Sequence, residues 1–204
     1  MYFFGQDVDL SLSSLKPQTV ARLMYLATWL GYNSDYLFDN SEKMTRSQME
    51  NIMRLKPRTF KLFLKEVTEQ GYLIKDGKTY RLNANVFHRG KCKLDKSLID
   101  KRYVRVYIKY VRLLYEMTPQ NKHVNLGYIF QLIPFVNREY NVVCHNPLET
   151  NKDLIEPMTV GELCDAIGYD RSQASRLLDI YDNITFTADG QSYYFCGYAS
   201  RNRK

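Results

Sequence analysis

Residues 45–82, TRSQMENIMRLKPRTFKLFLKEVTEQGYLIKDGKTYRL, decide the fold that the sequence predicts. Thr45 and Gln48 have the spacing of a capping box, which predicts the start of a helix. Pro57 fits the first position of a second helix, where its missing N–H costs nothing. Gly71 fits the left-handed residue that ends this helix. An Asp-Gly pair between two β-rich runs then predicts a hairpin.

A helix, a short turn, a second helix and a two-stranded hairpin form the layout of a winged helix-turn-helix. In such a unit the second helix enters the DNA major groove and the hairpin reaches the neighbouring backbone. Phe60, Phe63, Leu64 and Val67 share one apolar stripe of the second helix, and polar and basic residues occupy its other faces. The predicted DNA-binding residues of this unit are Lys56, Arg58, Thr59, Lys61, Lys65, Lys75, Lys78, Arg89 and Lys91.

The charge of the chain is segregated along the sequence. The net charge is +7, but residues 41–122 hold 20 Lys and Arg against 8 Asp and Glu, whereas the rest of the chain holds 9 against 14. Such a distribution places a positive field on one part of the molecule and favours a polyanionic partner.

The same order of elements returns near the C-terminus. Thr159 and Glu162 form a second capping box, Asp170 fits the cap of a helix from Arg171 to about Ile180, and ITFT-ADG-QSYYFCGY predicts a second hairpin. This unit is shorter and less basic than the first one. It is therefore expected either to bind DNA weakly or to bind a protein. Its predicted DNA-binding residues are Arg171, Ser172, Gln173 and Arg176.

Two further helices complete the prediction. Residues 18–30 carry apolar positions at helical spacing, namely Val20, Leu23, Met24, Ala27 and Leu30. A long helix is predicted from Asp95 to Met117, and its heptad-like seam is expected to pack within the chain; the seam residues are Tyr103, Tyr107, Tyr110, Leu114 and Met117. The predicted fold is mainly α with small β-wings (α+β). Two winged helix-turn-helix units, 1–93 and 151–204, are joined by a helical connector, 94–150.

The stretches 21–38 and 44–91 resemble winged-helix proteins of phages and plasmids of Gram-positive bacteria, which include replication initiators and small phage regulators. The most specific part is Tyr80-Arg81-Leu82-Asn83 followed by Phe87-His88-Arg89-Gly90-Lys91. Residues 101–172 are similar to a longer phage family with two winged helices. The second recognition helix departs from that pattern, since it is shortened after Arg176-Leu177-Leu178. The resemblance implies a DNA-binding protein of a mobile element.

Signals for catalysis are weak. The three histidines are isolated, no phosphate-binding loop is present, and Cys144-His145 lacks the other half of a zinc site. We therefore expect no enzyme, no metal and no cofactor.

No apolar run reaches the roughly 18 residues of a membrane span, and four cysteines without a C-x-x-C pair favour reduced thiols and a cytoplasmic location.

Three functions stay open. The first is a transcriptional regulator that reads an operator through the first winged helix, and the second is a replication initiator that binds an origin with the same helix. The third is a phage protein that binds a host protein. The predicted partner is double-stranded DNA, with host transcription or replication proteins as further candidates and no membrane, and the predicted state is a monomer or weak homodimer.

Overall fold

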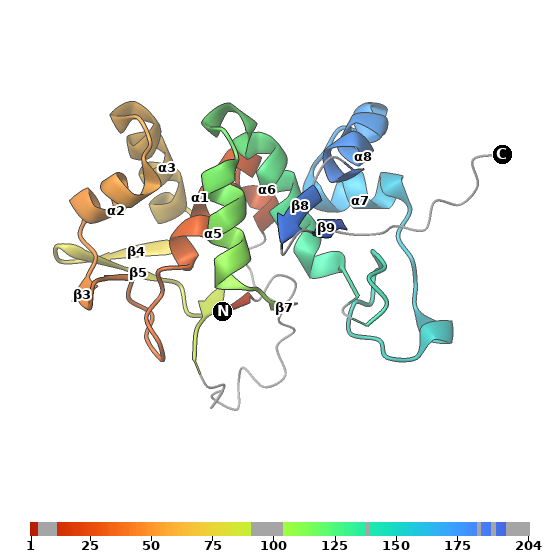
Figure 1. Ribbon diagram of the computed structural model, residues 1–204, viewed down its shortest axis with the longest axis horizontal. Helices are drawn as coiled ribbons and strands as arrows, with labels where there is room; N and C mark the ends of the chain where they lie inside the picture. The colour runs from red at the N-terminus through yellow and green to blue at the C-terminus, as the bar shows by residue number, and fades with distance from the viewer. Residues whose placement is uncertain (4–11, 91–103, 138, 183–184, 189–190, 195–204) are drawn as a thin grey trace. The chain divides into compact units, whose positions relative to one another are not determined.

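The computed structural model describes residues 1–3, 12–90, 104–137, 139–182, 185–188 and 191–194. The chain divides into two compact units, Met1–Phe130 and Gln131–Lys204. Helices predominate in the described residues, and the strands form small antiparallel sheets (Figure 1). The predicted mainly α, α+β class is therefore confirmed. None of the described helices is both long enough and apolar enough to span a membrane.

Helix α1, Pro17–Ala27, forms the centre of the first unit's core. All five apolar residues that predicted this helix are 0% exposed. The helix ends at Ala27, before the predicted residue 30, because Leu30 leaves it and pairs with Leu37 in an isolated β-bridge. Thr19, Ala21 and Tyr25 are buried as well, so α1 is enclosed on most sides and not along a single stripe.

Helices α2, Arg46–Met53, and α3, Pro57–Glu69, follow the local signals of the sequence. Thr45 and Gln48 form the capping box reciprocally, and Pro57 occupies the first turn of α3. Gly71 lies just after α3 with a φ of +76°, a conformation that glycine adopts without a steric penalty. Each of these predictions is confirmed.

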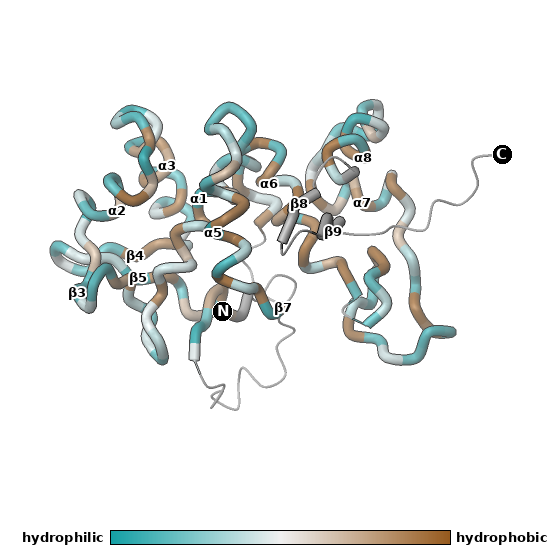
Figure 2. The backbone as a smooth tube through the Cα atoms, in the orientation of Figure 1, coloured by the Kyte–Doolittle hydropathy of each residue, from teal (hydrophilic) through white to brown (hydrophobic). Residues whose placement is uncertain are grey.

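The predicted hairpin is also present, as β4, Leu73–Asp76, and β5, Thr79–Leu82. Asp76 pairs with Thr79, so the two-residue loop is Gly77-Lys78 and not Asp76-Gly77. Gly77 has a φ of +59° at the first loop position, where type II′ turns place glycine. Figure 2 colours the tip of this hairpin teal, as expected for hydrophilic residues.

Short strands complete the sheets of the first unit. A three-stranded antiparallel sheet has the order β6-β1-β7, formed by Phe87–His88, Tyr2–Phe3 and Val104–Arg105. Strands β2, Phe38–Asp39, and β3, Glu42–Lys43, form a second hairpin. Two isolated bridges, Tyr36 to Arg81 and Thr45 to Thr79, connect the segments flanking β2–β3 to β5. A short 3₁₀ helix, η1, spans Leu12–Ser14.

The predicted helix from Asp95 to Met117 is confirmed over its C-terminal part, Ile108–Met117, and is wrong at Val104–Arg105. Val104–Arg105 form β7 because they pair with β1, and helix α5 begins only at Ile108 and ends at Met117. Residues 95–103, including Tyr103 of the predicted seam, lie outside the described residues.

The expected burial of the seam is wrong as well. Tyr107 is 62% exposed, Tyr110 41% and Met117 71%, while Leu114 is half-buried. The buried residues of α5 are Val111 and Tyr115. The reason is that the Tyr115 ring stacks on Tyr25 of α1 at 4.0 Å, which turns a different face of α5 toward the core.

The chain then forms η2, Gln120–Lys122, helix α6, His123–Leu132, and η3, Ile133–Phe135. Helix α6 ends at Leu132, two residues before Pro134, which is consistent with the bias of residues before a proline away from helix. Helix α6 approaches the start of α1 so closely that a Cβ on Gly127 would lie 1.8 Å from the carbonyl oxygen of Pro17. Only glycine fits at that position. Thus α5 and most of α6 belong to the first compact unit, although the sequence assigned them to a connector.

The second unit repeats the order of helix, turn, helix and hairpin. Its elements are η4 Lys152–Leu154, α7 Val160–Ile167, η5 Arg171–Gln173, α8 Ala174–Asp182, β8 Thr185–Ala188 and β9 Gln191–Tyr194. The capping box of Thr159 and Glu162 is confirmed. Helix α8 runs to Asp182, so the helix is not cut short after Leu178. Around Cys144 the chain forms two isolated β-bridges, which join Val136 to Val143 and Cys144 to Pro157.

Candidate functional site

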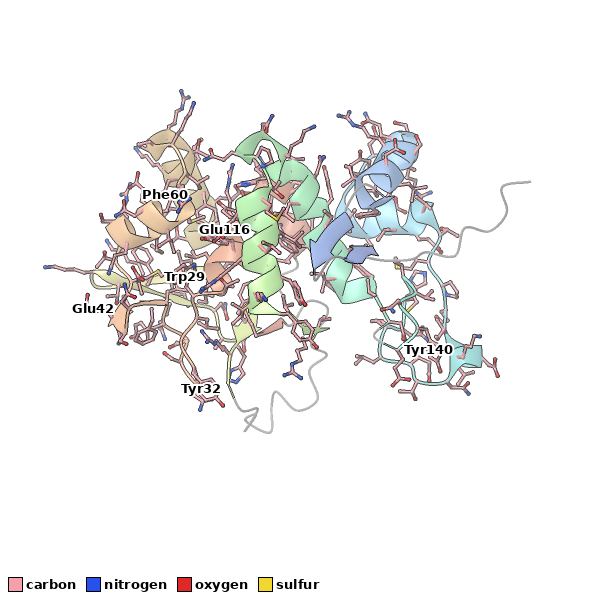
Figure 3. All side chains as sticks on the ribbon, in the orientation of Figure 1. Trp29, Tyr32, Glu42, Phe60, Glu116 and Tyr140 are labelled. Atoms are coloured by element: carbon pink, nitrogen blue, oxygen red, sulfur yellow. The ribbon has the colours of Figure 1, made fainter. Side chains whose placement is uncertain are left out.

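Helix α3 has one buried and one exposed face. Phe60, Phe63 and Val67 are at most 1% exposed, and Phe60 lies between α3 and α2 (Figure 3), with the Arg46 guanidinium 6.0 Å from its ring. The opposite face carries Arg58, Lys61, Leu62 and Lys65, all exposed. These four residues recur at spacings of three, one and three, which places them on one side of a helix. We call them the α3 stripe.

The cations of this helix are largely unpaired. Lys56, Arg58 and Lys61 make no ion pair or hydrogen bond through their side chains within the described part of the chain. Lys65 Nζ lies 3.7 Å from Glu69 Oε1, with both side chains about two-thirds exposed. A single ion-pair contact as exposed as this one is weak, so Lys65 can exchange Glu69 for another anion. The stripe is therefore positively charged.

The hairpin β4–β5 carries two more predicted cations, Lys75 and Lys78, and both are exposed. A hydrogen bond from the Tyr36 hydroxyl to the Asp76 carboxylate fixes the end of β4 and raises the pKa of Tyr36. Arg81 of β5 donates to Asp35 at 3.2 Å. The two lysines thus project from a hairpin whose own polar groups are tied to the segment before β2.

Three of the predicted DNA-binding residues of this unit are not described as exposed. Thr59 is half-buried. Arg89 is half-buried too, and its guanidinium donates to the Leu30 carbonyl oxygen at 2.7 Å, so this arginine holds the end of the α1 segment. Lys91 lies outside the described residues.

The turn between α2 and α3 is held by side chains from distant elements. Arg54, with a φ of +50°, closes α2, and the last carbonyls of a helix have no partner within it. The Tyr25 hydroxyl donates to the Ile52 carbonyl and the Tyr115 hydroxyl to the Met53 carbonyl, each at 3.4 Å. Gln120 Nε2 donates to the Arg54 carbonyl at 2.6 Å.

Sequence reasoning missed this anchoring because the donors stand 27, 62 and 66 residues away from their acceptors. A tyrosine or a glutamine on its own gives no signal of such a partner. The contacts make α1, α5 and η2 part of the structure that positions α3.

A buried histidine lies behind the same anchor. His123 is 2% exposed, its ring stands 4.4 Å from that of Tyr115, and its Nε2 is 3.2 Å from the Thr118 carbonyl oxygen. Because a carbonyl only accepts, Nε2 carries the proton in the neutral ring. Burial, together with the nearby Arg22, lowers the pKa of His123, and burial raises that of Tyr115.

The second unit presents its predicted residues differently. Arg171 donates through Nε to Asp165 Oδ1 at 2.6 Å, and through a second nitrogen to the other oxygen of this carboxylate. The bonds lower the pKa of Asp165. Ser172, Gln173 and Arg176 are exposed. The charge of Arg171 is thus offset within the protein by a bidentate pair.

The described residues give no arrangement suited to a metal ion. Among them, no three His, Cys, Asp or Glu side chains lie close enough together to hold one. Cys144 and Cys164 are buried free thiols, and burial raises the pKa of both. His145 Nε2 lies 3.6 Å from Glu162 Oε1, next to the capping box of α7.

Comparison of the chain with protein-family models, with curated proteins and with solved structures finds no match.

Proposed function

We propose that the chain binds double-stranded DNA through a winged helix formed by α2, α3 and the β4–β5 hairpin. In this proposal α3 enters the major groove, which is wide enough for one helix. The hairpin lies over the adjacent backbone.

The observation that carries the proposal is the α3 stripe. Its cations lie opposite the buried face that contains Phe60 and Phe63, so the helix can contact DNA without leaving its core. The N-terminal half of a recognition helix usually points toward base edges, and Arg58 and Lys61 lie in that half of α3. Guanidinium and ammonium groups donate to O6 and N7 of guanine.

The hairpin cations are assigned a different role. Lys75 and Lys78 flank or occupy its tip, and their ammonium groups act as point charges that suit phosphates. Contacts to phosphates position a protein on the duplex but carry no sequence information directly. Lys75→Ala and Lys78→Ala are therefore expected to weaken binding to all sequences about equally.

We propose that the protein is a non-catalytic transcriptional regulator of a phage or plasmid that reads an operator. A replication initiator that binds an origin through the same helix is the alternative, because the winged-helix proteins that the chain resembles include both plasmid initiators and small phage regulators. Binding of a host protein is the third function, and the positive charge of residues 41–122 favours DNA over it.

Selection of bound duplexes from a random library tests the proposal. The wild-type chain is expected to recover a defined site, whereas Arg58→Ala and Lys61→Ala recover sites degenerate at one position each, with a loss of about 1–3 kcal/mol of discrimination. Lys152→Ala, which removes an exposed lysine of the second unit, is the matched control. If both α3 variants recover the wild-type site with unchanged discrimination, α3 does not read the bases.

Mapping of the bound DNA across the mobile element then separates the two DNA-binding functions. Occupancy upstream of a coding region is expected for a regulator, whereas repeats inside a coding region indicate an initiator.

A further inference from the structure

Leu62 is the one apolar member of the α3 stripe. Its side chain is 60% exposed. Leu62 lies four residues after Arg58 and three residues before Lys65, so a cation precedes it and another follows it on the same side of the helix. The buried face of α3 is formed without it, by Phe60, Phe63 and Val67. The side chain of Leu62 is therefore accessible to a partner that lies along the α3 stripe.

The α3 stripe is matched in charge to the phosphates of a duplex, and a leucine side chain can neither donate nor accept a hydrogen bond. In the major groove the base edges present donors and acceptors and one apolar group, the C5 methyl of thymine. An apolar side chain among cations thus has one chemically matched partner there.

We infer that Leu62 is a specificity-determining residue that contacts the C5 methyl of a thymine in the major groove. The inference rests on the proposed function of α3 and adds the base that this helix selects. Arg58 and Lys61 select by hydrogen bonds, whereas Leu62 selects by burial of a methyl group. The recognised site therefore contains a thymine next to the bases read by the cations.

The experiment uses the full-length chain and the duplex that selection recovers with it. Each thymine of the site is replaced in turn by deoxyuridine, which removes only the methyl group. At one position the dissociation constant of the wild-type chain is expected to rise about threefold to fivefold, the factor that corresponds to one buried methyl. Leu62→Ala is expected to bind the thymine site more weakly by at least that factor and to bind the thymine and uracil duplexes equally.

Leu154→Ala is the matched control, since Leu154 is 58% exposed in the second unit and the substitution is identical. It is expected to keep the full preference for thymine over uracil. The inference is overturned if the wild-type chain is indifferent to every thymine replacement, or if Leu62→Ala retains the preference.

Two outcomes separate this inference from the proposed function. If selection recovers no site and binding shows no salt dependence, the proposed function itself fails. If the site is recovered and Arg58→Ala relaxes it, but Leu62→Ala leaves the affinity for DNA unchanged, the proposed function stands and Leu62 serves another contact, such as one with a protein.

Discussion

The segments α2 to β5 and α7 to β9 share their local construction and differ in their surfaces. Each begins with a reciprocal capping box, at Thr45 and at Thr159, and each ends in a two-stranded hairpin. On the exposed face of the second helix, however, Arg58 and Lys61 have no intramolecular partner within the described residues, whereas Arg171 is held by Asp165. Similar local signals therefore produce a similar backbone but leave different amounts of unpaired charge.

Their turns are stabilised in different ways as well. The α2–α3 turn receives hydrogen bonds from Tyr25, Tyr115 and Gln120, which belong to other elements. In the second unit the turn after α7 is closed locally, by the Tyr169 N–H donating to the Cys164 carbonyl at 2.7 Å. The orientation of α3 thus depends on the rest of its unit, and we expect substitutions far from α3 to affect its function.

The largest expected effect concerns the salt dependence of DNA binding. Combined removal of Lys75 and Lys78, the proposed phosphate contacts of the hairpin, should make the slope of log K against log salt shallower by up to about 1.8, because each phosphate contact contributes about 0.9. Combined removal of Arg171 and Arg176 should change it by less than about 1, since Arg171 is already paired. Titrations with one duplex over a range of salt concentrations measure both slopes. A larger loss for the second unit would reverse the assignment of the two units.

The second effect is on stability and concerns the buried His123. The pKa of His123 is lowered in the folded chain. Above the unfolded pKa of about 6.5 the ring is therefore neutral in both the folded and the unfolded chain. Below that pH the unfolded chain binds a proton that the folded chain does not. The free energy of unfolding should then fall as the pH decreases, by at most about 1.4 kcal/mol per pH unit from this group.

Urea unfolding between neutral and mildly acidic pH measures the slope. His123→Gln keeps an amide donor for the Thr118 carbonyl and should reduce the loss. Identical slopes for wild type and His123→Gln would contradict the role of this ring in acid sensitivity.

The sequence predicted most accurately those features of the fold that depend on residues close together in the chain. The capping boxes, Pro57 and Gly71 act within one or two turns of the chain, and the structure places each where it was expected. The hairpins follow for the same reason, and only the loop register differed, because Asp76 joins the strand.

What depends on distant residues was predicted poorly. Val104 and Arg105 read as helix, but they pair with Phe3 and Tyr2, about a hundred residues away. The Tyr107–Met117 seam was a plausible apolar row, yet stacking of Tyr115 on Tyr25 selected another row. Arg89 was predicted to contact DNA, but its guanidinium donates a hydrogen bond to the Leu30 carbonyl oxygen. Spacing along one helix shows which residues share a face but not which face another helix will cover.

The pairing of Arg171 gives a smaller effect that can be tested in the second unit. Asp165→Asn removes the carboxylate that holds this guanidinium, so Arg171 becomes available to a phosphate. The salt slope should steepen by about 0.9, the contribution of one contact. Asp153→Asn removes an equal charge from another exposed position of the unit and is the control. An equal change in both variants would mean that net charge, and not the freed arginine, is responsible.

The smallest expected effect concerns the anchor of the α2–α3 turn. Gln120→Ala removes the 2.6 Å hydrogen bond to the Arg54 carbonyl, and thermal unfolding should show a loss of about 0.5–1 kcal/mol. Because the cations of the α3 stripe stay in place, the salt slope should not change. Discrimination between the selected site and a mutated one should fall, since a loosened turn lets α3 shift against the base edges. Gln70→Ala, at an exposed position directly after α3, should alter neither quantity. If Gln120→Ala lowers stability but leaves discrimination intact, this glutamine serves the fold alone, and α3 is positioned by its core face and the two tyrosines.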